Sequence, residues 1–179
     1  MKKVLILSGS PRKGGNSDVL CDEFAKGAIS VGASVEKIRI SEKRIAPCTG
    51  CYFCKNNGGR CALNDDMGEV LEKILAADTL VLSSPVYFYS VSAQMKTVID
   101  RCVARWTEII NKELYYIMTA AEEDDDTMDG TLACFRGFAK CIDGYEEKGV
   151  LYGKGVYEKG DVLQRQELLQ IAYEMGQSV

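Results

Sequence analysis

VLILSGSPRKGGNSD, residues 4–18, joins a short apolar run to a polar, glycine-rich turn and a candidate helix start. Consecutive apolar residues of this kind predict a strand that is buried on both faces, as in a parallel sheet. Asn16 or Ser17 can begin the helix that follows, because both residue types are common helix N-caps. A strand, a turn and a helix in this order open a β-α-β unit, so the stretch indicates an α/β protein.

The rest of the chain continues the alternation of strands and helices. Further strands are predicted at residues 34–40, 79–84, 114–119 and 149–157. Helices with one apolar face are predicted between these strands and after the last strand. Asp66 and Glu69 have capping-box spacing at the start of one helix, and Ser92 is the predicted N-cap of another. Right-handed crossovers then give a five-stranded parallel sheet with helices on both faces. We expect one domain over residues 1–179, a flavodoxin-like three-layer sandwich with strand order 2-1-3-4-5.

Composition and charge exclude several classes of function. The chain of 179 residues is 46% hydrophobic and 27% charged with a net charge of −4, an ordinary globular balance without the basic character of a nucleic-acid-binding protein. The N-terminal apolar run is too short for a signal peptide, and no run reaches the roughly 18 apolar residues of a membrane span. We expect a cytoplasmic protein with no nucleic-acid or membrane partner. The absence of histidine excludes Ser-His-Asp hydrolysis and histidine-ligated metals.

The turn after the first strand has the composition of a phosphate site. In open α/β sheets, ligands bind beyond the carboxyl ends of the strands. There, the hydroxyls of Ser8 and Ser10, the Arg12 guanidinium and the Lys13 ammonium can bind an anion. The two glycines that follow allow close approach of the backbone, and a helix start favours negative charge. The pattern is neither G-x-G-x-x-G nor a P-loop, so it predicts a cradle for one terminal phosphate.

Two acidic features bear on this interpretation. Asp18 places a negative charge on the same helix end, so it must point away or be outweighed by Arg12 and Lys13. The acidic run at Glu122–Asp126 is interpreted as a solvated loop before a helix N-terminus. The alternative to a phosphate site is a glycine-rich turn that binds no ligand.

The loop after the third strand carries aromatic residues to the same edge of the sheet. Pro85 ends the strand, and Val86, Tyr87, Phe88 and Tyr89 follow. Aromatic residues in a row at a strand end usually belong to a core or a subunit interface. Beside a phosphate cradle they also form a flat apolar wall for a planar heterocycle. A phosphate site and a ring site on adjacent loops together suit flavin mononucleotide (FMN).

Four motifs occur in order along the chain: GSPRKGGNSD, C-x2-C-x2-C-x6-C before DDM, SSPVYFYSVSAQMKTVIDR and YGKGVYEKGD. From Met1 to about Asp161 the chain resembles the NAD(P)H-dependent FMN reductase group of the flavodoxin-like superfamily, which includes the iron-sulfur flavoproteins. The resemblance implies three sets of FMN-binding residues. The phosphate would be held by Ser10, Arg12, Asn16 and Ser17, with Lys13 nearby. The isoalloxazine ring would be lined by Pro85, Val86, Tyr87 and Phe88, and the ring or the ribityl chain would be flanked by Thr119 and Ala120. Many members have glycine where this chain has Tyr89, and the larger tyrosine side chain would narrow access to the ring. The resemblance also implies a homodimer with the flavin near the interface.

Half of the eight cysteines lie within fourteen residues, as Cys48, Cys51, Cys54 and Cys61. Their spacing resembles the cysteine run of ferredoxins, so the thiolates can surround a [4Fe-4S] cluster, as in the iron-sulfur flavoproteins. Structural zinc prefers two separated C-x2-C pairs. In other relatives nearly the same cysteines are packing residues beside the flavin. The sequence therefore leaves a cluster, a zinc ion and a metal-free loop as alternatives.

Flavin chemistry requires no histidine, because the isoalloxazine accepts a hydride from NAD(P)H while the protein binds, orients and excludes water. We therefore expect no catalytic side chain in an NAD(P)H-dependent, FMN-containing oxidoreductase. It would pass electrons to a quinone, a free flavin, another small acceptor or a protein. The second hypothesis is an electron carrier with FMN and a [4Fe-4S] cluster, and the third is a flavin-free binding domain.

Overall fold

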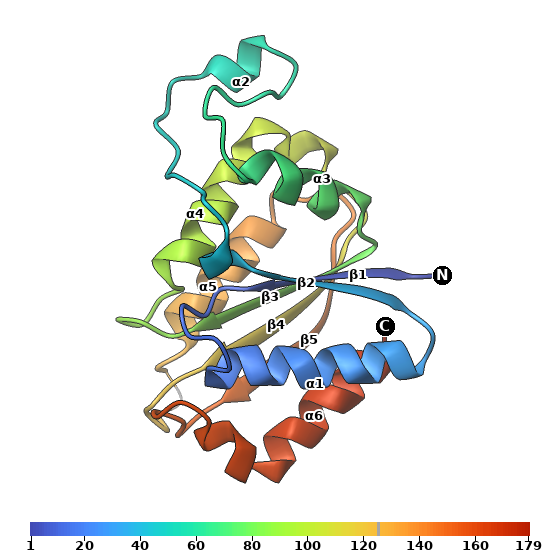
Figure 1. Cartoon of the computed structure of the whole chain (residues 1–179), viewed down its shortest axis with the longest axis vertical. Coiled ribbons are helices and arrows are strands. Elements are labelled where there is room, and N and C mark those ends of the chain that lie inside the picture. The colour runs from blue at the N-terminus through green and yellow to red at the C-terminus, as the bar shows by residue number, and fades with distance from the viewer. Residues whose placement is uncertain (125) are drawn as a thin grey trace.

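The computed structural model describes residues 1–124 and 126–179, which are built around a five-stranded sheet. The strands are β1 (Lys3–Ser8), β2 (Ser34–Arg39), β3 (Thr79–Pro85), β4 (Glu113–Thr119) and β5 (Glu146–Gly153). They lie in the order β2-β1-β3-β4-β5, and every pairing is parallel (Figure 1). The predicted flavodoxin-like strand order is confirmed. The order reverses between β1 and β3, and this switch point is where an open α/β sheet binds its ligand.

Helices cover both faces of the sheet, so the three-layer arrangement is also confirmed (Figure 1). One face carries α1 (Asn16–Ser30) and α6 (Gln166–Gln177), and the other carries α3 (Met67–Ala76), α4 (Ala93–Arg101) and α5 (Asp129–Ala139). The short α2 (Phe53–Asn56) lies at the far end of a long loop that leaves the body of the protein. Four 3-10 turns complete the described elements: η1 (Ile40–Glu42), η2 (Cys102–Ala104), η3 (Trp106–Glu108) and η4 (Asp161–Gln164).

The continuous apolar run of β1 is explained by burial on both sides. Val4 and Ile6 pack against the layer of α1 and α6, whereas Leu5 and Leu7 pack against the opposite layer. Each of these side chains is buried, and burial of such a side chain contributes about 1.5–3 kcal/mol. β1 is therefore fixed at the centre of the sheet, and the turn that follows it is held at the switch point.

Two glycines allow α1 and α6 to approach closely. A Cβ atom on Gly27 would lie 2.0 Å from the carbonyl oxygen of Tyr173, and one on Gly176 would lie 2.1 Å from that of Phe24. Neither position has room for a side chain. The close pairing of α1 and α6 brings η4, which precedes α6, into contact with α1.

Several predicted boundaries need correction. β5 begins at Glu146 and ends at Gly153, whereas the sequence predicted residues 149–157. As an edge strand it tolerates the polar residues at its start, and the left-handed φ of +66° at Gly155 turns the chain out of the sheet. The capping box is also wrong, because the Asp66 carboxylate accepts from Arg44 N and not from its own helix. The Ser92 cap is confirmed by a bond of 3.3 Å from Met95 N.

Within residues 1–124 and 126–179, the structure contains no helix with the length and apolar character needed to cross a membrane. Asp125, in the predicted acidic loop Glu122–Asp126, lies outside the described residues.

Candidate functional site

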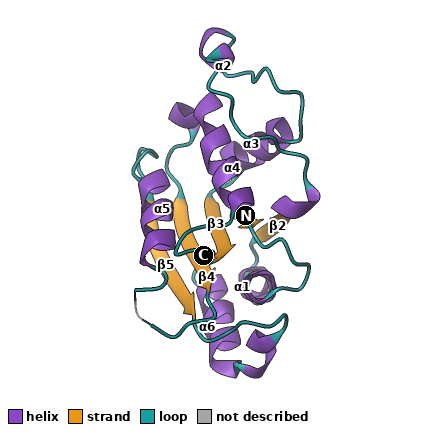
Figure 2. Cartoon of the chain, turned by 90° about the vertical axis from the view of Figure 1, so that its left-hand side faces the viewer, coloured by secondary structure: helices purple, strands orange, loops and turns teal. Residues whose placement is uncertain are grey.

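A cavity of about 360 Å³ lies at the carboxyl edge of the sheet, the edge that faces the viewer in Figure 2. The turns after β1, β3, β4 and β5 all contribute to it. Its lining consists of Ser10, Arg12, Gly15, Asn16, Ser17, Pro85, Val86, Tyr87, Phe88, Tyr89, Thr119, Ala120, Ala121, Glu122, Thr127, Val156 and Tyr157. The volume is within the range of small-molecule sites, about 300–1,000 Å³.

The structure brings together every predicted FMN-binding residue except Lys13. Ser10, Arg12, Asn16 and Ser17 line one side of the cavity. The residues predicted for the ring and the ribityl chain, Pro85, Val86, Tyr87, Phe88, Thr119 and Ala120, line the rest. Lys13 is exposed to solvent and does not line the cavity.

The start of α1 offers unpaired donors to this cavity. Gly15 occupies the N-cap position, so no side chain caps the helix. Across the described residues, the backbone N–H groups of Asn16, Ser17 and Asp18 donate to no hydrogen-bond acceptor. A Cβ atom on Gly15 would lie 2.7 Å from Ser10 Oγ, so a larger residue would fill the cradle. Free N–H groups at a helix N-terminus, beside a hydroxyl and a guanidinium, match the needs of a phosphate.

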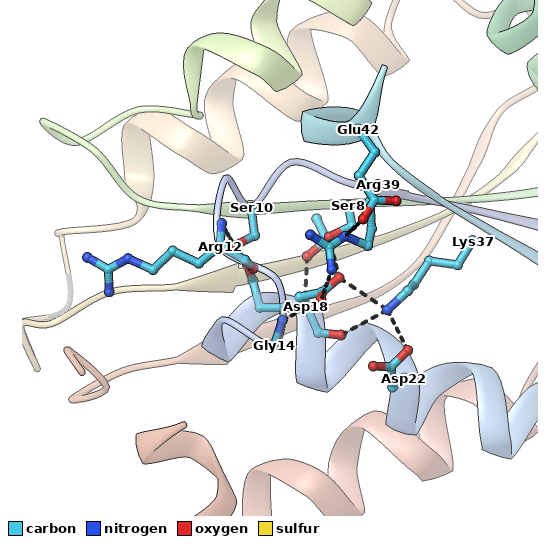
Figure 3. A network of polar contacts seen from close by, with 11 residues as sticks. Ser8, Ser10, Arg12, Gly14, Asp18, Asp22, Lys37, Arg39 and Glu42 are labelled. Carbon is cyan, nitrogen blue, oxygen red and sulfur yellow. Dashed lines mark hydrogen bonds and ion pairs between the residues drawn. The ribbon is translucent and has the colours of Figure 1, made fainter. Parts of the chain in front are cut away.

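Asp18 points away from the cavity into a cationic network (Figure 3). Its carboxylate lies 3.1 Å from Lys37 Nζ and 3.5 Å from Arg39 Nη1, both on the neighbouring strand β2. It also accepts hydrogen bonds from Ser8 Oγ at 2.9 Å and from Gly14 N at 2.9 Å. The Arg12 side chain extends in the other direction, away from Asp18. Lys37 and Arg39 therefore compensate the acidic charge, and Arg12 remains available to a ligand.

The environment of Asp18 also shifts its pKa. Burial on its own raises the pKa, but the hydrogen bonds from Gly14 N, Ser8 and Lys37 and the charge of Lys37 outweigh it. The pKa of Asp18 therefore lies below the ordinary 3.8, and the carboxylate stays ionised at neutral pH. By accepting from Gly14 N, it also fixes the glycine turn that shapes the cradle.

The aromatic wall is a tight turn in an unusual conformation. Ser90 N donates to Tyr87 O at 3.1 Å, and the two central residues, Phe88 and Tyr89, have φ values of +49° and +60°. Positive φ at both central positions is the geometry of a type I′ turn, which normally selects glycine or asparagine. Gly130 of α5 packs under this turn, since its Cβ atom would lie 2.1 Å from Tyr89 O. Phe88 is fully exposed and Tyr89 is largely exposed.

The backbone donors of this turn are only partly used. Val86 N donates to Thr119 O at 2.8 Å, and Tyr87 N donates to Ser90 O at 2.9 Å. In the described part of the chain, the N–H groups of Phe88 and Tyr89 have no acceptor. These two N–H groups are therefore the ones that can meet the polar edge of a ring.

Sequence reasoning found Ala120 in the loop after β4 but missed the other contributions of that loop and of the loop after β5. Glu122 and Thr127 come from the first loop, and Val156 and Tyr157 come from the second. The sequence predicts Val156 and Tyr157 within the last strand, and this prediction hides their place in a binding loop. The signal was Gly155, where the left-handed backbone ends the extended run.

The loop with Cys48, Cys51, Cys54 and Cys61 lies apart from this cavity (Figures 1 and 2). Cys48 and Cys51 are exposed, whereas Cys54 and Cys61 are partly buried. Among the described residues, no three acidic or cysteine side chains are grouped as metal ligands. The thiols in this conformation therefore do not fit an iron-sulfur cluster or a zinc ion without rearrangement of the loop.

A buried ion pair closes the neck of the cysteine loop. Arg101, only 2% exposed, contacts the Asp65 carboxylate through both Nη atoms at 2.7 and 2.9 Å. It also donates to Ala46 O at 2.6 Å and to Cys61 Sγ at 3.4 Å. Asp65 in turn accepts from Ala46 N at 3.0 Å. The two ends of the loop are thus joined, above a second hollow of about 550 Å³ that shares no lining residue with the first.

The strand order and the residues at the carboxyl edge are those of a known class of α/β proteins. An open parallel sheet in the order 2-1-3-4-5, with an anion cradle after β1 and an aromatic wall after β3, is a flavodoxin-like protein. Residues 2–125 match the model of the NADPH-dependent FMN reductase family, so the chain belongs to that family.

The chain is also similar to curated relatives, and it shares its fold with solved structures. The chain is similar to an iron-sulfur flavoprotein of Methanocaldococcus jannaschii, with 43% identity over 99 residues that cover 55% of this chain and 51% of the relative. An iron-sulfur flavoprotein of Archaeoglobus fulgidus is 48% identical over 101 residues, 56% of this chain and 45% of the relative. The match thus spans about half the length of these curated relatives. An FMN-dependent NADH-azoreductase of Bacillus anthracis, solved in complex with FMN, has a TM-score of 0.71 at 18% identity and covers 99% of this chain and 97% of its own.

Proposed function

We propose that this chain binds FMN in the 360 Å³ cavity, with the phosphate at the start of α1 and the isoalloxazine ring against residues 85–89. One observation carries the proposal: the uncapped N-terminus of α1 and the aromatic turn border one cavity. The donor set suits an anion, and the turn presents aromatic rings and two backbone N–H groups that have no acceptor among the described residues. Membership of the NADPH-dependent FMN reductase family supports the choice of FMN among phosphorylated heterocycles.

Bound FMN supplies hydride and electron transfer chemistry, and the chain supplies binding and orientation. Ser10, Arg12 and the N–H groups of Asn16 and Ser17 hold the phosphate. Phe88 and Tyr89 present their N–H groups to the ring, and Thr119 and Ala120 border it on the side of β4. No side chain has to act as a base, which agrees with a chain that contains no histidine.

The reaction that we propose is oxidation of NAD(P)H with transfer of the electrons to a small organic acceptor such as a quinone or a free flavin. The test is anaerobic addition of NADH and of NADPH to the FMN-loaded protein. We expect one of them to bleach the visible flavin band and a quinone to restore it. A flavin that stays oxidised with both nicotinamides would contradict a reductase.

The second candidate function is an electron carrier with FMN and a [4Fe-4S] cluster. It is supported by the names of the curated relatives and by the four cysteines on one loop. Because the thiols are not grouped in the described conformation, cluster binding would require the loop to rearrange. Iron and acid-labile sulfide after anaerobic purification decide between the candidates: about four of each per chain favour the carrier. Cys51→Ser should then lose both, and Cys141→Ser, outside the loop, should lose neither.

Three further expectations stay predictions. They are the single domain over residues 1–179, the cytoplasmic location and the homodimer. Light scattering of the purified protein with and without FMN tests the homodimer.

A further inference from the structure

We propose that Asn16 is a positioning residue, whose side chain holds the segment of residues 157–162 against the phosphate turn and thereby places Tyr157 at the cavity. This inference rests on the proposed FMN site and deepens it. It gives the side chain of Asn16 a role beyond the expected one of this residue in binding the phosphate. It concerns two parts of the chain that are about 140 residues apart in the sequence.

The Asn16 side chain makes three hydrogen bonds to the backbone of this segment. Its Nδ2 donates to Glu158 O at 2.9 Å, and its Oδ1 accepts from Gly160 N at 3.1 Å and from Val162 N at 3.2 Å. The residue is only 8% exposed. Both lone pairs of the amide oxygen are therefore used, and the orientation of the side chain is set by the segment.

An internal hydrogen-bond network also holds the segment together. The Asp161 carboxylate accepts from Tyr157 N at 2.9 Å and from Glu158 N at 2.7 Å, which makes the segment a compact turn. Val162 is fully buried in the layer of α1 and α6. Tyr157 lines the cavity, yet its side chain lies at the surface with 69% exposure. Its place thus depends on the turn that Asn16 holds.

Arg12 is coupled to the same segment. Its Nη1 lies 3.5 Å from Tyr157 O, so the guanidinium and the tyrosine backbone are neighbours at the mouth of the cavity. Loss of the Asn16 bonds would release Tyr157 and with it the contact that orients Arg12. The helix start retains its backbone N–H groups, because these do not depend on the Asn16 side chain.

An amide suits this arrangement, because its nitrogen donates one bond while its separate oxygen accepts two. Aspartate at this position would keep the two acceptor bonds to Gly160 N and Val162 N but would lose the donor to Glu158 O. It would also add a negative charge where the phosphate is expected. Alanine would lose all three bonds.

The first experiment is hydrogen exchange without flavin. In Asn16→Ala we expect the amides of Gly160 and Val162 to exchange about tenfold faster, because each loses a buried hydrogen bond. Amides of β3 should be unchanged. Gln166→Ala is the matched control, since its amide donates to Leu163 O, outside the segment. Unchanged exchange at residues 158–162 in Asn16→Ala would overturn the proposal, whether or not the protein binds flavin.

The second experiment compares FMN with riboflavin, which lacks the phosphate. A positioning role predicts that Asn16→Ala weakens the binding of riboflavin as well as that of FMN, and that adding Tyr157→Ala to it causes no further loss of riboflavin affinity. Asn16→Asp, which keeps two of the three bonds, should lose less riboflavin affinity than Asn16→Ala and more FMN affinity than riboflavin affinity, and it serves also if the alanine variant does not fold. Weaker binding of FMN alone in Asn16→Ala would instead make Asn16 a direct phosphate ligand. If the parent binds neither flavin, the proposed function fails and the exchange experiment still decides on Asn16.

Discussion

At the scale of single residues, the charge balance of the phosphate turn is decided by a neighbouring strand. The sequence places Asp18 on the helix end that should receive an anion. The register of the sheet pairs Ser8 of β1 with Arg39 of β2, and this brings Arg39 and Lys37 beside Asp18. The compensating charges come from residues about 20 positions away, so the local sequence pattern could not reveal them.

We predict that Asp18→Asn lowers the free energy of unfolding by about 1–3 kcal/mol at pH 7, because Lys37 and Arg39 lose their buried partner. The folded pKa of Asp18 lies below 3.8, so its contribution to stability is present above that value and is lost as the pH falls through the folded pKa. Urea denaturation should therefore show the largest difference between parent and variant near neutral pH and a smaller one near pH 3. A difference that grows on acidification would contradict this assignment.

At the scale of elements, the aromatic turn after β3 combines bulky residues with a backbone that disfavours them. A residue with a Cβ atom costs about 1–2 kcal/mol in the left-handed region, and both Phe88 and Tyr89 occupy it. The close contact of Gly130 with Tyr89 O and the hydrogen bond from Val86 N to Thr119 O hold the turn in place. Strain of this kind is concentrated at ligand sites, where it fixes the direction of backbone donors.

Tyr89→Gly and Tyr89→Val form a matched pair that tests this strain. Both variants remove the phenol ring, but glycine adopts positive φ freely whereas a β-branched residue does not. We predict that the glycine variant is the more stable of the two by roughly 1–2 kcal/mol, measured by chemical denaturation without flavin. Equal stabilities would show that residue 89 does not hold the left-handed conformation in solution.

The elements also show which structural features could be predicted from the sequence and which could not. The five strands and the Ser92 cap follow from local pattern, because buried parallel strands and helix caps have short-range signals, and the strand order follows from the rules for β-α-β crossovers in doubly wound sheets. The start of β5 was missed because an edge strand can be polar, and the capping box failed because Asp66 binds Arg44 N across a loop. The neck between Arg101 and Asp65 and the Asn16 bonds to residues 158–162 are long-range contacts with no local signal.

At the scale of the whole molecule, the two features singled out by the sequence lie in different places. The cavity at the carboxyl edge gathers turns from four strands. The cysteine loop is an appendage closed at its neck by Arg101 and Asp65, above a separate hollow. Because the two hollows share no lining residue, variants can be directed at one without changing the lining of the other, and the two candidate functions can be tested separately.

Comparison of FMN and riboflavin binding by calorimetry, in the parent and in Arg12→Ala, tests the central claim most directly. A phosphate held at the start of α1 predicts one FMN per chain and at least about tenfold tighter binding of FMN than of riboflavin, since charge-assisted bonds contribute roughly 1.5–3 kcal/mol each. Arg12→Ala should narrow that difference and leave riboflavin affinity and the unfolding midpoint nearly unchanged. A parent protein that binds both flavins equally, or binds neither, would contradict the account.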